Sequence, residues 1–145
     1  MISKGYAAKR CRISYKTADQ SENWIMKATF DIFEKKGVLF ICIEGDPTVD
    51  DIKQALDQTR DESGYNHLSR LWDFRNASFD FNAEELEEIA SHASTADLDP
   101  SRVAMLVSQD LSFGVSRMYE AYRKSSMTDV KVFREEAEAI DWLLE

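Results

Sequence analysis

The residues best placed to bind or react are polar side chains that directly follow hydrophobic, strand-like segments. Asp73 lies at the end of one such segment, Arg75 directly follows it, and Ser108 follows another. In an open sheet of parallel strands, ligands bind outside the carboxyl ends of the strands. The free N–H groups of a helix that begins near Ser112 could bind an anion there, and an arginine could pair with its carboxylate or phosphate. The predicted ligand-binding residues are therefore Asp73, Arg75, Ser108, Asp110, Ser112, Gly114 and Arg117.

These residues also have a purely structural interpretation. Arg75 can pair with Asp73 or Asp110, and Asp110 can cap the helix that follows it. Gly114 in an early helical turn costs stability, so we expect it to permit close packing against a strand or close approach of a ligand. Hydrolysis by paired carboxylates needs two acids that face one cleft. Asp73 with Asp110 is the pair to test for that activity.

The sequence contains no recognisable catalytic, metal or nucleotide motif. His67 and His92 are the two histidines, and neither has a Cys, Asp or Glu at ligand spacing. We expect both to be surface residues, and we predict no catalytic residue, metal site or cofactor. Cys11 and Cys42 lack the spacing of a redox or metal motif, which favours free thiols in a reduced, cytoplasmic setting.

Composition limits the possible partners. The net charge of −9 disfavours nucleic-acid binding, which needs a basic face. The first 16 residues differ from the rest, with five basic residues and no acid. No apolar run approaches the roughly 20 residues of a membrane-spanning helix, so we expect no integral membrane segment.

Hydrophobic periodicity predicts the elements that position these side chains. The segment Arg10–Lys16 alternates like a half-buried strand, and Met26–Phe33 and Val38–Ile43 form a hairpin around Gly37. Two further strands, Ser69–Phe74 and Arg102–Val107, and a last one, Val130–Phe133, alternate with helices. The order is ββαβαβαβα after a possible extra N-terminal strand, which predicts an α/β fold with a mixed, mainly parallel sheet.

The helices show apolar stripes and start signals. Thr48 and Asp51 have the spacing of a capping box, and Asn82 can cap the second helix. The third helix, Leu111–Lys124, is expected to bury Leu111, Val115, Met118 or Tyr119, and Tyr122. The last helix, Glu135–Leu144, is expected to bury Ala137, Ile140, Leu143 and Trp142.

Four segments of this chain resemble the STAS domain superfamily in its SpoIIAA-like branch. They are VLFICIEGDPT (Val38–Thr48), LWDFRNASFDF (Leu71–Phe81), RVAMLVSQDLSFGVSRMYEAY (Arg102–Tyr122) and VKVFREEAEAIDWL (Val130–Leu143). The resemblance covers Ala28 to Leu144 and implies a non-enzymatic domain. The branch is also similar in fold to CRAL-TRIO proteins, which implies that a pocket for an apolar ligand could exist.

Members of the wider superfamily are implied to be switched by phosphorylation of a serine in a D-S-S-G-like motif after the third core strand. Asp80 matches the aspartate of that motif here, but Phe81 and Asn82 occupy the serine positions and no glycine follows. We therefore predict that the phosphoswitch is absent. Ser78 lies two residues before Asp80 and is expected to be a solvent-facing serine.

Together these features predict a basic N-terminal extension, residues 1–27, and a STAS-like domain, residues 28–145. The expected function is non-enzymatic regulation or signalling through a protein partner or a homodimer, in which Tyr119 and Tyr122 could take part. The alternative is a sensor or carrier of a small apolar or anionic ligand, with a pocket between the sheet edge and the third helix.

Overall fold

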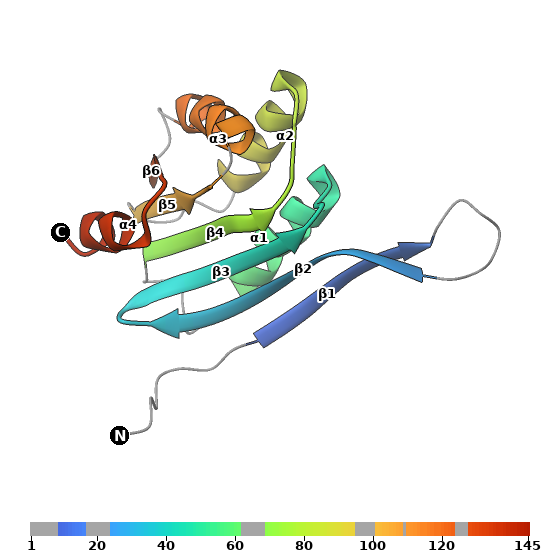
Figure 1. The fold of residues 1–145 in the computed structure, drawn as a ribbon, viewed down its shortest axis with the longest axis horizontal. Coiled ribbons are helices and arrows are strands. Elements are labelled where there is room, and N and C mark those ends of the chain that lie inside the picture. Colours follow the sequence, from blue (N-terminus) through green and yellow to red (C-terminus); the bar gives the residue numbers. More distant parts are fainter. Residues whose placement is uncertain (1–8, 17–23, 62–68, 95–100, 109, 124–127) are drawn as a thin grey trace.

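The chain forms one six-stranded sheet in which the strands follow one another in sequence order. The computed structural model describes residues 9–16, 24–61, 69–94, 101–108, 110–123 and 128–145. β1, β2 and β3 are antiparallel, whereas β3 to β6 are parallel (Figure 1). This confirms the mixed α/β fold and the extra N-terminal strand. The strands are β1 (Lys9–Lys16), β2 (Trp24–Lys35), β3 (Val38–Gly45), β4 (Ser69–Ala77), β5 (Ser101–Leu106) and β6 (Thr128–Phe133).

The hairpin between β2 and β3 turns on two residues. Lys36 and Gly37 have φ angles of 57° and 79°. Positive φ at both positions is the pattern of a type I′ turn, whose twist matches that of the flanking strands. The glycine was expected at the turn, but Lys36 also adopts the left-handed conformation.

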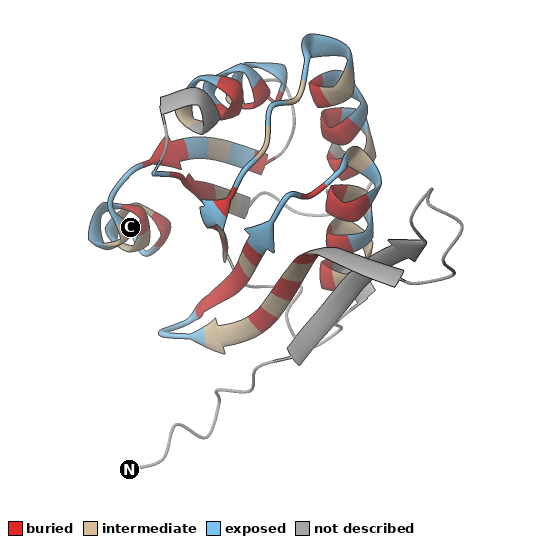
Figure 2. Ribbon diagram, turned by 45° about the vertical axis from the view of Figure 1, so that its right-hand side comes forward, coloured by how far each residue is buried: buried red, intermediate tan, exposed pale blue. Residues whose placement is uncertain are grey.

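Burial follows the sequence pattern in these two strands. Buried and half-buried residues alternate from Ala28 to Phe33 in β2, because one face of the strand lies against the main core. β3 is buried almost continuously from Val38 to Ile43, as a central strand covered on both faces should be (Figure 2).

Three helices link the parallel strands and cover the same face of the sheet. α1 (Val49–Asp61), α2 (Ala83–Ser94) and α3 (Asp110–Tyr122) follow β3, β4 and β5. Right-handed crossovers that advance in one direction across a sheet place every helix on one face. The side chains of these helices pack in one cluster with Phe30, Ile41 and Trp72.

The fourth helix lies on the other face. α4 (Glu136–Leu143) follows β6 and packs in a second cluster with Phe40, Leu71 and Leu106. Its apolar residues Ala139 and Leu143 are buried in this second cluster. Within the described ranges, no helix has both the length and the apolar character that crossing a membrane requires.

Local sequence determines where α1 and α2 begin. The Thr48 hydroxyl accepts from the Asp51 N–H at 3.1 Å, and the Asp51 carboxylate accepts from the Thr48 N–H at 2.9 Å. Asn82 and Glu85 repeat this arrangement at the start of α2, at 2.8 and 2.9 Å. Both predicted caps are confirmed, and each is a reciprocal capping box.

Two predicted stripes are partly wrong. On α3, Val115 and Tyr119 are buried, but Tyr122 is 39% exposed, and Arg123 directly after the helix is buried instead. The guanidinium of Arg123 donates to the Tyr119 hydroxyl at 2.8 Å, so a polar side chain is accommodated where periodicity predicts an apolar one.

On α4, Ala137 is exposed and Ala139 is fully buried. Alanine contributes little to an apolar stripe, so periodicity does not distinguish these two positions. The face is set by contact with β5, where Ala104 and Leu106 are completely buried. Leu143 is buried as predicted, and Ile140 and Trp142 are half-buried.

Candidate functional site

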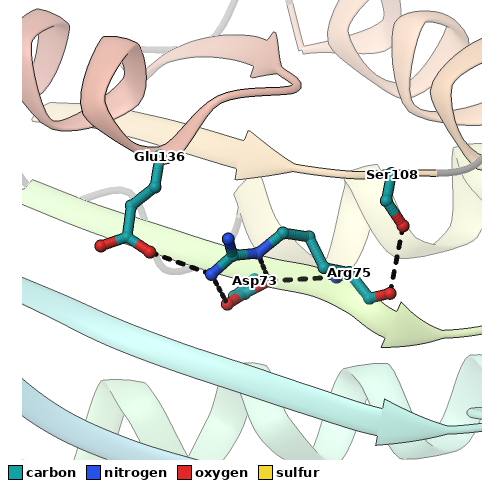
Figure 3. A network of polar contacts seen from close by, with 4 residues as sticks. All are labelled: Asp73, Arg75, Ser108 and Glu136. Atoms are coloured by element: carbon teal, nitrogen blue, oxygen red, sulfur yellow. Dashed lines mark hydrogen bonds and ion pairs between the residues drawn. The ribbon is translucent and has the colours of Figure 1, made fainter.

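A cluster of charged side chains joins β4 to the start of α4 on the face that α4 covers. Nε and Nη2 of Arg75 donate to the two carboxylate oxygens of Asp73 at 3.0 and 2.8 Å. Nη2 also donates to Glu136 at 2.9 Å (Figure 3). The hydroxyl of Ser108 donates to the main-chain oxygen of Arg75 at 3.1 Å. The structure thus brings three predicted residues together, with Arg75 paired to Asp73 as in the structural interpretation.

The electrostatics of this cluster do not favour a bound anion. Two carboxylates surround one guanidinium, so the group carries a net negative charge. Hydrogen bonding to Asp73 is the main cause that raises the pKa of Arg75, and Glu136 adds to it. Arg75 is therefore permanently charged and already occupied by acids of this chain.

Cys42 lies beside this cluster in the middle of the sheet. It is paired in register with Asp73 on β4 and with Asp31 on β2. Burial, together with the negative charge of the nearby Asp73 and Asp31 carboxylates, raises the pKa of the Cys42 thiol to about 12. Because the thiolate is the nucleophilic form, this cysteine is unsuited to covalent chemistry.

The other predicted ligand-binding residues are distributed along α3. The side chains of Asp110 and Ser112 fall outside the described residues, although both positions belong to the first turn of α3. Gly114 is exposed, and among the described residues no atom outside the helix backbone and the adjacent residues lies within 4 Å of the position a Cβ would occupy. Close packing against a strand is therefore the wrong explanation for this glycine. Arg117 pairs with Glu120 one turn further along the helix, at 3.1 Å.

The connection from β4 to α2 presents an aromatic surface that the sequence interpretation did not identify. Phe79 and Phe81 stack with ring centroids 5.5 Å apart, and Phe79 packs edge-on against Phe74 at 5.1 Å. Both rings are half-buried, whereas Ser78, Asp80 and Asn82 between and beside them are exposed. The loop is held at both ends, because the N–H of Ser78 donates to the carbonyl of Gly45 at 2.8 Å and Asn82 caps α2. The alternation of phenylalanine with polar residues in this segment is the sequence signal that could have indicated this surface. We name Ser78–Asn82 the aromatic loop.

The sequence neighbours of His92 indicate a surface histidine without a partner, but in the structure its side chain contacts Asp57. Its Nε2 lies 2.8 Å from the carboxylate of Asp57, so the pair joins α2 to α1. Lys53 of α1 pairs with Glu88 of α2 in the same way. His67 lies outside the described residues. Across the described part of the chain, no three His, Cys, Asp or Glu side chains converge into a metal-binding group.

A cleft of about 400 Å³ lies at β6, the last strand of the sheet. α3 contributes Arg117 and Glu120 to its wall, Arg123 directly follows α3 and also lines it, and α4 contributes Trp142. The floor is formed by residues 128–132 of β6. None of residues 108–114, where a ligand pocket was predicted, lines this cleft.

Searches against protein-family models and against curated proteins found no match to this chain.

Proposed function

We propose that this chain is a non-enzymatic protein-interaction domain of the STAS type, and that it binds its partner through the aromatic loop. One observation carries the proposal: two stacked, half-buried phenylalanines pack against the main core on a loop that is fixed at both ends. Aromatic side chains in such positions commonly dominate the energy of protein interfaces. A loop that is already ordered loses little conformational entropy on binding.

The charge around the loop indicates what kind of partner would fit. Asp80 lies between the two phenylalanines in sequence, Glu84 lies in the first turn of α2, and Glu44 and Asp46 flank Gly45 at the end of β3; all four are exposed. Because Gly45 is hydrogen-bonded to Ser78, these acids border the aromatic loop. A complementary partner would offer an apolar pocket with basic residues around it.

The environments of Arg75 and Cys42 support the proposal that this domain is not an enzyme. Arg75 is held by Asp73 and Glu136, and burial keeps Cys42 protonated. Both groups thereby lose the free charge or nucleophilicity that a reaction would need. Since Phe81 and Asn82 stand where the superfamily motif has serines, we propose that binding is not controlled by phosphorylation of this loop.

The test begins with affinity capture by the full chain, followed by purification of the retained protein. We expect Phe81→Ala to weaken the measured affinity for that protein by about tenfold or more. Tyr122→Ala is the matched control, because Tyr122 is also a partly exposed aromatic residue but lies on α3. Thermal melts of both variants show whether they remain folded. A partner that binds Phe81→Ala and the unchanged chain equally would contradict the proposal.

The alternative of a small-ligand sensor makes a different prediction. A ligand held beside Ser108 and Gly114 would bind less tightly when Gly114 gains a methyl group, while Phe81→Ala would leave its affinity unchanged. A thermal-shift screen of apolar and anionic compounds on the unchanged chain and on Gly114→Ala distinguishes the two functions.

A further inference from the structure

The two edges of the sheet differ in their charge. β1 forms one edge, and its sequence carries Lys9, Arg10, Arg12 and Lys16 without an acid. Its pairing with β2 is also irregular between Ile13 and Ser14. Like charges and bulges both protect an edge strand against pairing with a copy of itself. β6 forms the other edge, and there one acid and one base, Asp129 and Lys131, flank Val130.

The backbone of β6 is oriented for pairing at its outer side. The carbonyl of Phe133 accepts from Val107 N–H, so the polar backbone groups of Phe133 point toward β5. Backbone groups alternate in direction along a strand. Those of Lys131 and Asp129 therefore also point toward β5, while those of Val130 and Val132 point away from the sheet. The part of the chain that the structure describes places no strand on that side.

We propose that a second copy of this chain pairs with β6 in an antiparallel arrangement centred on Val130, which makes one continuous sheet across a symmetric dimer. In this register Val130 exchanges backbone hydrogen bonds with Val130 of the partner subunit. Asp129 then lies opposite Lys131 of the partner subunit, and the symmetry repeats this ion pair. Residues 129 and 131 occupy the positions without backbone hydrogen bonds, where opposing side chains are closest.

The surroundings of these two charges fit this arrangement. Asp129 and Lys131 are both exposed, and the ammonium of Lys131 lies 5.3 Å from the Phe133 ring and 5.9 Å from the Trp142 ring. Among the described residues neither forms a salt bridge, so both remain available to a partner. The cleft at β6 reaches the strand at residues 128–132, of which Asp129 and Lys131 are exposed, Val130 is half-buried, and Thr128 and Val132 are buried. Isologous interfaces need such a self-complementary patch.

Charge reversal tests the register directly. Asp129→Lys places a positive charge opposite Lys131 of the partner subunit in both symmetric pairs, and Lys131→Glu places a negative charge opposite Asp129 of the partner subunit. We expect either change to raise the dimer dissociation constant by about tenfold or more. An equimolar mixture of the two variants should restore dimerisation, because each then meets the opposite charge. Glu87→Lys, an exposed change of equal charge on α2, is the control and should have no effect.

Analytical ultracentrifugation over a range of concentrations measures these dissociation constants. Val130→Pro gives a second test that does not depend on charge, because an edge strand tolerates proline where its N–H points outward. This variant should be a folded monomer by circular dichroism. A chain that is monomeric at all concentrations would overturn the proposal, as would a dimer that survives both reversals. The interface uses no residue of the aromatic loop, so partner binding and dimerisation can fail independently.

Discussion

At the scale of single residues, environment decides what each candidate side chain can do. Arg75 has the chemistry of an anion-binding residue, but two carboxylates of the same chain occupy its donors. Cys42 has the chemistry of a nucleophile, but burial and nearby negative charge keep it protonated. Gly114 has the conformational freedom of a special position, but its surroundings require none. The environments of Gly114 and Cys42 each lead to a testable prediction.

Gly114→Ala should stabilise the protein. A glycine inside a helix costs about 0.5–1 kcal/mol relative to alanine, and among the described residues the new methyl group would meet no atom of another element within 4 Å. We expect the free energy of unfolding in urea to rise by that amount. A loss of stability would mean that α3 packs more closely at Gly114 than the structure shows.

Cys42 should react slowly with thiol reagents. With a pKa of about 12, only roughly one molecule in 10,000 carries the thiolate at pH 8. Because the pKa is raised, the labelling rate should continue to increase with pH well above 9, where an ordinary cysteine has levelled off. The measurement uses Cys11→Ser, so that one thiol remains. The same variant unfolded in urea is the control and should label at the rate of a free cysteine. A plateau near pH 9 in the folded protein would contradict the assignment.

At the scale of elements, α4 is positioned differently from α1 and α2. Those helices begin at capping boxes encoded within four residues, whereas Glu135 at the start of α4 makes no side-chain cap. Side chains from the strands hold α4 at both ends. Arg75 of β4 binds Glu136 in its first turn, and Arg102 of β5 donates to the carbonyl of Trp142 at 2.6 Å. The Arg102 guanidinium also lies 5.1 Å from the Trp142 ring.

Arg75→Ala should therefore destabilise the protein more than removal of an ordinary surface arginine. It leaves Asp73 and Glu136 without their shared cation and releases the start of α4. We expect a loss of about 1 kcal/mol, measured by urea unfolding. Arg117→Ala removes a helix-surface ion pair and is the control, with an expected change below about 0.5 kcal/mol. Equal effects of the two changes would show that the Arg75 cluster has no special structural role.

At the scale of the whole molecule, the two faces of the sheet are covered unequally. Three crossover helices cover one face, and α4 is the only helix among the described elements on the other. The second core is correspondingly small and depends on few side chains of α4, with Ala139 and Leu143 fully or nearly buried. Stability should be sensitive to this helix although it lies at the end of the chain.

Leu143 and Leu144 provide an adjacent pair that tests this dependence. Leu143 is 6% exposed, whereas Leu144 is 55% exposed. Leu143→Ala removes buried methyl groups and should lower the free energy of unfolding by about 2–4 kcal/mol. Leu144→Ala should change it by less than about 0.5 kcal/mol. Similar values for the two variants would mean that α4 does not seal the second face in solution.

The sequence by itself determined the features that depend on neighbouring residues. Alternation predicted β2, an unbroken apolar run predicted the buried strand β3, and cap spacing predicted the starts of α1 and α2. These signals succeed because each rests on backbone geometry within a few residues. The pairing of Arg75 with Asp73, two residues apart, was within reach for the same reason.

Only the tertiary structure decided which distant residues meet. Glu136 reaches Arg75 across 61 positions, and Asp57 reaches His92 across 35. The buried face of α4 and the cleft at β6 also depend on where whole elements pack. Periodicity specifies that a helix has an apolar side, but small residues such as Ala137 and Ala139 leave its phase open. The face on which a helix packs is then set by the shape and burial of its neighbours in space.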